Sequence, residues 1–327
     1  MVDQQTVIIV KPDGIAKGLV GLIINTLCAY GLSIVDSARV SLDRSWVKQL
    51  YAGEEQQSYF HEVVEWVSSA PVLLLKISGQ DAVAKVKWQI IGKYPDGIRG
   101  QYSEDGIRNV AHAPDSLASA ERELLLAEPV FARRSTMDKE RLTGKMVFAL
   151  TGMSECGKST VGRYLDSQGI PRLKIVKLFG KVRDKRAPGL DLKEFNTQEE
   201  RRDPYALWDA FVDELLIEMN SRSVAVASIE SLYGGGLGPY LQKKMATSFC
   251  IVYIDAAEDK RLELQVIREN LATVEEARLL LLPRDKIKAD SGIPQLKDIA
   301  GEIIDNNGTL EDLYRAVDKV VKKYRPQ

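Results

Sequence analysis

The chain has 327 residues, which is more than one hydrophobic core usually supports, so we expect two domains. Its formal net charge of −1 excludes a general attraction to nucleic acid or to an anionic membrane. No apolar run approaches the ~18 to 20 residues of a membrane span, and three widely spaced cysteines without a CxxC pair indicate a reducing, cytoplasmic setting.

The N-terminal half alternates between apolar strands and helices. Apolar runs and alternation predict strands at residues 6–10, 32–42 and 71–79. Helical spacing predicts helices at residues 18–31, 45–53, 59–70, 81–92 and 116–128. This order predicts one α+β domain over residues 1–130.

The second half begins after a charged segment, residues 131–144, which we interpret as a linker. Strands are expected at 146–152, 223–229 and 248–256, and helices at 158–168, 204–221, 258–271 and 309–324. Alternating strands and helices predict an α/β domain with a doubly wound parallel sheet over residues 145–327.

A histidine in an unusual setting is the first candidate for chemistry. His112 is one of only two histidines, and it lies in the stretch "RNVAHAPDS", residues 108–116. A neutral imidazole can attack a γ-phosphoryl group directly, because its nitrogen lone pair needs no base to remove a proton. Such a site also needs cations for the phosphates, an acceptor for the other ring nitrogen, and an aromatic surface for the base.

Three stretches supply these groups in order: "VKPDGIAKGLVGLII", "GIRG" and "IRNVAHAPDS". Together they make residues 6–128 resemble the nucleoside diphosphate kinase family. The resemblance implies a ferredoxin-like fold, self-association through this domain, and ping-pong transfer of a γ-phosphate through phosphorylated His112. It also implies roles for seven other residues: Lys11, Arg99 and Arg108 at the phosphates, Asn109 at the sugar, Tyr51 near the histidine, Tyr59 stacked on the base, and Glu123 orienting the imidazole.

The chain departs from the family pattern at three positions. Trp88 stands where the family has a phosphate-contacting arginine, with Lys87 beside it. Tyr94 replaces a phosphate-contacting threonine, and Pro114 replaces a serine. Loss of an arginine weakens the stabilisation of transition-state charge.

The second candidate is the stretch "GMSECGKST", which fits the phosphate-binding pattern G-x-x-x-x-G-K-[ST] between an apolar strand and a helix. Backbone N–H groups of such a loop surround phosphate oxygens, and the helix N-terminus adds its dipole. We expect Lys158 to bridge the β- and γ-phosphates of ATP and Ser159 to hold Mg²⁺. The predicted nucleotide-binding residues are Gly152, Met153, Ser154, Glu155, Cys156, Gly157, Lys158, Ser159 and Thr160.

With this loop, residues 145–322 resemble the P-loop nucleotide kinase superfamily, near dephospho-CoA kinase and deoxynucleoside monophosphate kinase. The resemblance implies that Asn306 and Asn307 lie near the ATP base. Cations in the C-terminal third form a candidate lid, with a solvated helical face as the alternative: Arg268, Arg278, Arg284, Lys286 and Lys288. The strand at 223–229 leads to Glu230, where an aspartate is usual. Clustered cations after the first helix of this half form a candidate acceptor site, with ordinary surface as the alternative: Lys177, Lys181, Arg183, Lys185 and Arg186.

Three functions remain open at this point. The first is a fused enzyme of nucleotide metabolism, in which the P-loop half phosphorylates a nucleoside monophosphate or a related compound and the histidine half exchanges γ-phosphates between NTP and NDP. In the second, only the P-loop half is a kinase, and the N-terminal domain binds nucleotide or drives oligomerisation. The third is a nucleotide-dependent regulator. All three require Mg²⁺ and ATP, and none requires a specific nucleic acid.

Overall fold

The computed structural model describes residues 3–93, 95–233 and 236–324. It divides into two compact units. The N-terminal unit consists of Met1–Met137 together with Lys193–Leu207, and the C-terminal unit consists of Asp138–Leu192 and Trp208–Gln327.

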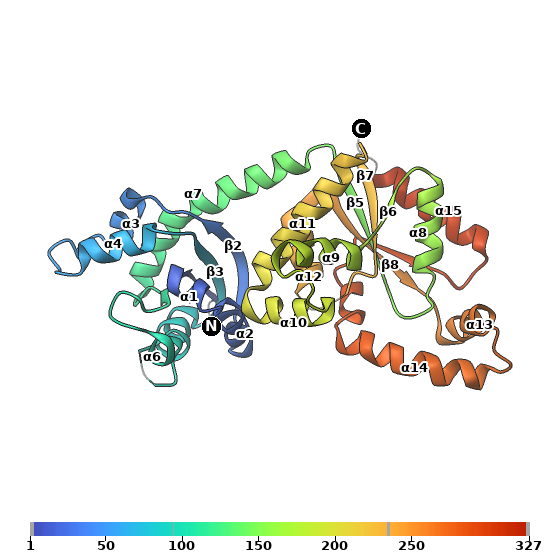
Figure 1. The fold of residues 1–327 in the computed structure, drawn as a ribbon, viewed down its shortest axis with the longest axis horizontal. Helices are drawn as coiled ribbons and strands as arrows, with labels where there is room; N and C mark the ends of the chain where they lie inside the picture. Colours follow the sequence, from blue (N-terminus) through green and yellow to red (C-terminus); the bar gives the residue numbers. More distant parts are fainter. Residues whose placement is uncertain (1–2, 94, 234–235, 325–327) are drawn as a thin grey trace. The chain divides into compact units, whose positions relative to one another are not determined.

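The N-terminal unit contains an antiparallel sheet of four strands in the order β2-β3-β1-β4 (Figure 1). The strands are β1 (Asp3–Val10), β2 (Ser33–Val40), β3 (Val72–Gln80) and β4 (Ala111–His112). This order, with helices between the strands, is the expected ferredoxin-like α+β fold.

Helices cover both faces of this sheet. They are α1 (Pro12–Ala16), α2 (Val20–Ala29), α3 (Arg44–Leu50), α4 (Phe60–Ser68), α5 (Ala82–Ala84), α6 (Ile98–Tyr102) and α7 (Leu117–Leu142). Alternate residues of β1 enter different cores: Ile8 and Val10 pack with residues of α2, whereas Val7 and Ile9 pack with residues of α3 and α4. A strand buried on both faces explains why residues 6–10 show an unbroken apolar run.

Two elements differ from the expectation in the N-terminal half. The predicted linker 131–144 is helical as far as Leu142, because α7 continues through it and buries Phe131 in the core. Its charged residues include strong helix formers, so charge alone did not indicate an irregular segment. The predicted helix 81–92 contains a π-helical turn, η1 (Lys85–Ile90), directly after α5. The domain boundaries themselves stay a prediction.

A segment from the second half of the chain belongs to the N-terminal unit. It comprises most of α10 (Leu192–Arg202) and the start of α11 (Pro204–Ser221). Asp203 is buried and forms an ion pair with Arg39 of β2, while Tyr205 packs against the core that contains α2. The approach is closest at Gly21, where a Cβ atom would lie 2.0 Å from the carbonyl oxygen of Arg201.

The C-terminal unit contains a parallel sheet of five strands in the order β6-β7-β5-β8-β9. The strands are β5 (Met146–Thr151), β6 (Arg172–Lys174), β7 (Val226–Glu230), β8 (Phe249–Asp255) and β9 (Glu302–Asp305). The parallel α/β architecture expected for this half is therefore present.

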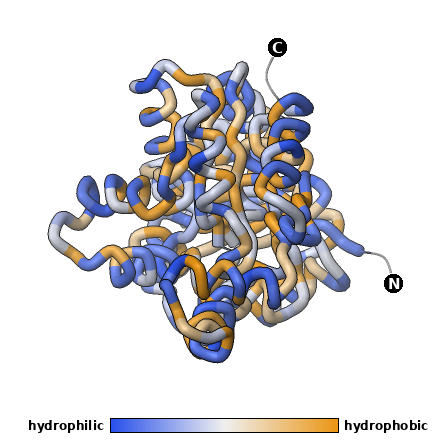
Figure 2. The backbone as a smooth tube through the Cα atoms, turned by 90° about the vertical axis from the view of Figure 1, so that its right-hand side faces the viewer, coloured by the Kyte–Doolittle hydropathy of each residue, from blue (hydrophilic) through white to orange (hydrophobic). Residues whose placement is uncertain are grey.

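Helices again lie on both faces. They are α8 (Lys158–Ser167), α9 (Ile175–Arg186), α11, α12 (Leu237–Met245), α13 (Glu258–Glu269), α14 (Val274–Asp290) and α15 (Leu310–Tyr324), with short 3₁₀ turns at Ala246–Ser248 and Pro294–Lys297. Figure 1 shows α8 and α15 together on one side of the sheet, where Tyr164 and Tyr314 stack with their ring centroids 3.9 Å apart. Hydrophobic and hydrophilic residues alternate along the helices in Figure 2, as expected for helices that bury one face.

Within the described ranges, none of the helices combines the length and the apolar character that crossing a membrane requires.

The contact at Gly21 leads to a prediction about segment 193–207. A Gly→Ala change inside a helix normally stabilises it by about 1 kcal/mol. In Gly21→Ala the new methyl group would instead collide with the backbone of Arg201, so we expect the segment to detach and trypsin to cleave after Arg201 and Arg202 faster than in the wild type. Limited proteolysis with mass spectrometry measures this rate.

Gly180→Ala is the matched control, since Gly180 also lies in a helix but has no atom within 4 Å of the added Cβ. This variant should keep the wild-type cleavage rate at Arg201 and Arg202. Equal protection of both variants would show that the segment is not held against α2.

Candidate functional site

The short strand β4 and the first part of α7 bring His112 and Glu123 together. Nε2 of His112 donates to Oε2 of Glu123 over 2.8 Å, and the Glu123 side chain is almost fully buried. The second oxygen of Glu123 accepts from Arg122 over 3.2 Å. Nδ1 of His112 has no hydrogen-bond partner among the described residues, so its lone pair is available.

Tyr51 fixes the imidazole from the side. Its ring meets the ring of His112 edge-on, with the centroids 5.4 Å apart and the planes at 70°. Tyr51 is buried in the core beside α3 and α4, and this burial raises the pKa of its hydroxyl well above the usual value. The phenol therefore remains neutral and acts as a packing surface for the histidine.

Two buried cations lie near the histidine. Lys11 follows β1, and its Nζ donates to Oδ1 of Asn109 over 2.8 Å and to the carbonyl oxygen of Ile107 over 3.1 Å. Burial and, after it, the charge of Arg99 lower the pKa of Lys11 to about 7. Burial also lowers the pKa of Arg99, whose Nε has no partner among the described residues. Nearby carboxylates, Asp13 among them, oppose these shifts only in part, and perturbed cations gathered in one region are typical of a functional site.

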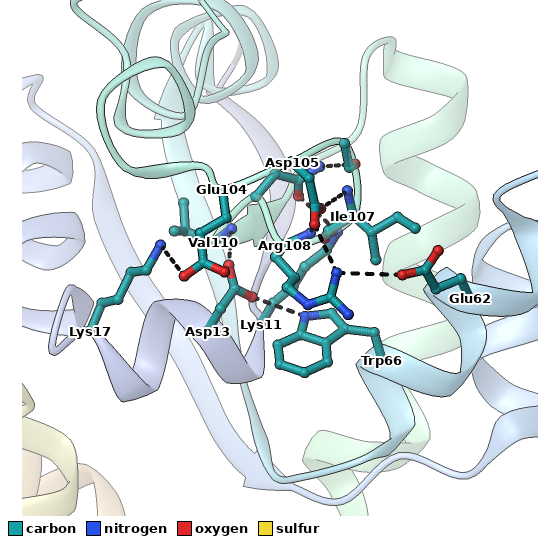
Figure 3. A network of polar contacts seen from close by, with 12 residues as sticks. Lys11, Asp13, Lys17, Glu62, Trp66, Glu104, Asp105, Ile107, Arg108 and Val110 are labelled. Atoms are coloured by element: carbon teal, nitrogen blue, oxygen red, sulfur yellow. Dashed lines mark hydrogen bonds and ion pairs between the residues drawn. The ribbon is translucent and has the colours of Figure 1, made fainter.

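Asp13 holds the backbone that leads to His112 (Figure 3). Val110 has φ 62°, which is strained for a β-branched residue. One carboxylate oxygen of Asp13 accepts from the backbone N–H of Val110 over 2.7 Å, and the other accepts from Nε1 of Trp66 over 3.1 Å. Sequence reasoning did not select Asp13, although its place in "KPDG" beside Lys11 was a usable signal.

Two of the expected residues lie at the edge of this cluster. The guanidinium of Arg108 pairs with Asp105 and Glu62 and lies over the ring of Trp66, 5.0 Å from its centroid (Figure 3). Tyr59 is exposed and donates its hydroxyl hydrogen to Glu54 over 2.6 Å. Neither side chain points at the imidazole in this structure, and the exposed ring of Tyr59 leaves a face open for stacking.

The departures from the family pattern have visible consequences. Trp88 is 55% exposed and takes no part in the cluster around His112. Pro114 is buried two residues after the histidine. Tyr94 lies outside the described residues.

The second predicted site forms the expected strand, loop and helix. The loop follows β5 and precedes α8, and both of its glycines have positive φ angles, 131° at Gly152 and 103° at Gly157. Lys158 turns back into the loop, where Nζ donates to the carbonyl oxygens of Gly152 over 2.9 Å and of Met153 over 2.5 Å. In the first turn of α8, the N–H groups of Thr160 and Val161 both donate to the carbonyl oxygen of Gly157 over 3.0 Å.

Glu230 is the acidic partner of this loop. It ends β7, the strand beside β5, and its Oε1 accepts from Oγ of Ser159 over 2.5 Å. Its other oxygen pairs with Arg172 of β6. Glu230 was noted in the sequence only as a departure from aspartate, and the parallel register of β7 with β5 is what places it beside Ser159.

The other residues predicted to bind nucleotide in this half have structural partners. Nδ2 of Asn306 donates to the carbonyl oxygen of Cys156 over 2.9 Å, and Oδ1 of Asn307 accepts from the backbone of Ala257 over 2.8 Å. Asn306 therefore supports the loop from the side of β9. Arg284 is exposed and reaches Gln265 over 3.5 Å, whereas its neighbour Asp285 accepts from the N–H of Ser154 over 3.0 Å.

Other cations of this half fall into two groups. Lys288 of α14 lies close to Lys158, and burial together with that charge lowers its pKa to about 8. By contrast, Lys181 and Lys185 of α9 are paired with Glu218 and Glu214 of α11. These two lysines of the candidate acceptor cluster are thus already neutralised by neighbouring carboxylates.

Known proteins resemble the first part of the chain. The family model described as nucleoside diphosphate kinase matches residues 4–130. A nucleoside diphosphate kinase of Saccharolobus solfataricus is 38% identical over 132 residues, covering 38% of this chain and 95% of that relative. One from Listeria monocytogenes is 36% identical over 129 residues, covering 38% and 87%. A crystal structure of the Aquifex aeolicus enzyme is 31% identical, covers 38% and 94%, and has a TM-score of 0.37.

The role of Asp13 can be tested through stability. In Asp13→Asn the amide can accept from only one of the two N–H groups and turns its NH₂ toward the other, leaving a buried donor unsatisfied at a cost of about 1–3 kcal/mol. We expect a lower free energy of unfolding for the N-terminal unit, measured by urea denaturation.

The double variant Asp13→Asn with Val110→Gly should recover part of this loss, since glycine adopts positive φ without strain. Wild-type stability in Asp13→Asn would contradict the role assigned to the carboxylate.

Proposed function

The chain belongs to the nucleoside diphosphate kinase family through residues 4–130, and on that premise we propose that His112 carries a phosphoryl group from one nucleotide to another. The observation that supports this most directly is the state of the imidazole. Glu123 accepts the hydrogen of Nε2, which leaves the lone pair on Nδ1, and Nδ1 has no partner among the described residues.

The reaction then proceeds in two transfers. Nδ1 of His112 attacks the γ-phosphorus of a nucleoside triphosphate, the bond from that phosphorus to the β–γ bridging oxygen breaks, and a nucleoside diphosphate leaves with the bond's electron pair. The terminal oxygen of a second nucleoside diphosphate attacks the phosphohistidine, and the electron pair of the N–P bond returns to Nδ1. Glu123 stabilises the positive imidazole ring during both transfers.

Lys11, Arg99 and Arg108 would carry the phosphates. Lys11 and Arg99 lie in a buried region, where each charge interacts with a phosphate more strongly than it would in water. Arg108 would leave Asp105 and Glu62 for the more highly charged nucleotide. Asn109 would reach the sugar, and the exposed ring of Tyr59 would stack on the base.

We further propose that the C-terminal unit binds ATP in the loop Gly152–Thr160. Support comes from the two glycines with positive φ, the start of α8 directly behind the loop, and Lys158 inside it. The acceptor would be a nucleoside monophosphate or a related phosphorylated compound. Arg172 of β6, which pairs with Glu230 at the end of the adjacent strand β7, would exchange this carboxylate for its phosphate.

The donor groups beside this loop fit Mg²⁺. Magnesium prefers few protein oxygens and keeps several waters, and Oγ of Ser159 and the carboxylate of Glu230 lie together at the strand ends. Among the residues that the structure describes, no cluster of three histidine, cysteine or acidic side chains offers a fuller metal site. Bound there with ATP, Mg²⁺ would neutralise phosphate charge.

The proposal therefore describes a fused, cytoplasmic phosphotransferase of nucleotide metabolism. When one chain catalyses two consecutive steps, the product of the first step is present at a raised effective concentration near the site of the second step. Self-association through the N-terminal unit stays part of the proposal, but it must use surfaces other than the part of α2 that Arg201 and Arg202 cover.

Labelling with γ-labelled ATP tests the histidine. The wild type should acquire an acid-labile, base-stable phosphate, and His112→Ala should not. His61→Ala is the control, because it removes the other histidine of the chain, which lies on α4, and should leave the label intact. A wild type without label would leave only the alternative, in which the N-terminal unit binds nucleotide without transferring phosphate.

The two sites can be separated by crossed variants. Lys158→Ala should abolish ATP-dependent consumption of a nucleoside monophosphate and leave the label on His112 at the wild-type level. His112→Ala should show the opposite pattern. Coupled measurement of ADP release over a panel of monophosphates gives the first readout, and no consumption of any of them by the wild type would refute the proposed acceptor.

Glu123→Gln should slow phosphorylation of His112 by about 10- to 100-fold, the usual effect of changing the group that orients a histidine. The amide can still accept from Nε2, but it cannot balance the positive charge of the ring. Rapid-quench measurement at saturating ATP gives the rate. An unchanged rate would show that the carboxylate charge does not contribute.

A further inference from the structure

Three cations from three separate elements gather beside His112, and only two of them belong to the expected set. Lys11 follows β1, and Arg99 lies in α6. The third is Lys87, which lies in the π-helical turn η1. Sequence reasoning noted Lys87 only as the neighbour of Trp88.

Lys87 reaches the histidine strand through its side chain. Its Nζ donates to the carbonyl oxygen of Ala113 over 2.8 Å, and Ala113 is the residue directly after His112. The neighbouring side chains of the turn point elsewhere: Trp88 is 55% exposed, and Lys85 donates to the carbonyl oxygen of Tyr30 over 3.3 Å. Of the two lysines in the π-helical turn, Lys87 is thus the one that contacts the residue next to His112.

The charges around Lys87 are those of the His112 site. Burial and then the charge of Arg99 lower the pKa of Lys87, and Arg99 acts in the same way on Lys11. Glu123, the partner of His112, and Asp115 raise the pKa of Lys87. Because the charge of Arg99 acts on both lysines, the three cations lie in one region and repel one another there.

We propose that Lys87 binds the phosphoryl group that His112 receives, completing a set of three cations with Lys11 and Arg99. An ammonium group has three N–H donors, and the structure gives one of them, to Ala113, a partner among the described residues. The remaining two can donate to oxygens of the phosphoryl group as it passes to His112. This inference rests on the proposed transfer through His112.

The test compares four proteins in single-turnover phosphorylation of His112 at saturating ATP. Lys87→Met removes the charge and keeps the length of the side chain, and it should slow the reaction about 10²-fold, the effect of removing one donor from a developing anion. Lys87→Arg should recover a large part of the rate. Lys85→Met loses the same charge from the same turn and should react like the wild type, because its amine contacts Tyr30 instead.

The outcomes separate this inference from the proposed function. A wild-type rate in Lys87→Met, with His112 labelled, would overturn the role of Lys87 and leave the transfer through His112 intact. Equal slowing in Lys87→Met and Lys85→Met would also overturn it, since the effect would then come from net charge. Slowing of Lys87→Met alone, at an unchanged unfolding temperature, supports it. A wild type that never acquires the label would remove the basis of both proposals.

Discussion

The hydrogen bond from His112 to Glu123 determines which ring nitrogen can react. Because the carboxylate takes the hydrogen of Nε2, the lone pair must reside on Nδ1, and every other group of the site has to be arranged around that atom. The bond joins a two-residue strand to the first turns of a long helix, so it depends on the packing of both against the sheet. The backbone at Val110 has a strained, positive φ and is held by Asp13. This conformation sets the direction in which β4 presents the ring of His112.

The N-terminal fold and the contact of His112 with Glu123 could be predicted from the sequence for a simple reason. The apolar run of β1 and the helical spacing of α2 are local patterns, and the motifs around Lys11 and His112 lie at the ends of these elements. The contribution of Lys87 could not be predicted in this way. A regular α-helix and a π-helical turn have the same apolar pattern over so few residues, but they direct positions 87 and 88 differently.

The C-terminal half shows the complementary limit of sequence reasoning. The residues that shape a contiguous loop such as Gly152–Thr160 all lie in one stretch of the sequence. The partner of Ser159, by contrast, lies 71 residues away on another strand. Segment 193–207 was expected to belong to the parallel-sheet half, because its helical pattern says nothing about the surface it packs on. Its place is set by long-range contacts, such as the ion pair of Asp203 with Arg39, that no local pattern contains.

The two proposed phosphate sites would use different physical means, and this difference bears on how each would tolerate change. In the C-terminal loop, backbone N–H groups would supply the donors, so side chains such as Cys156 could vary while the glycines, with their positive φ angles, could not. At His112 the donors are side chains with partly buried charges, each brought by a different element. In such a site, a lysine at position 87 can supply the positive charge that an arginine at position 88 supplies in the family. The π-helical turn makes this possible, because it changes the directions of these two side chains. A histidine site that departs from its family pattern can therefore keep the charge that the transfer requires.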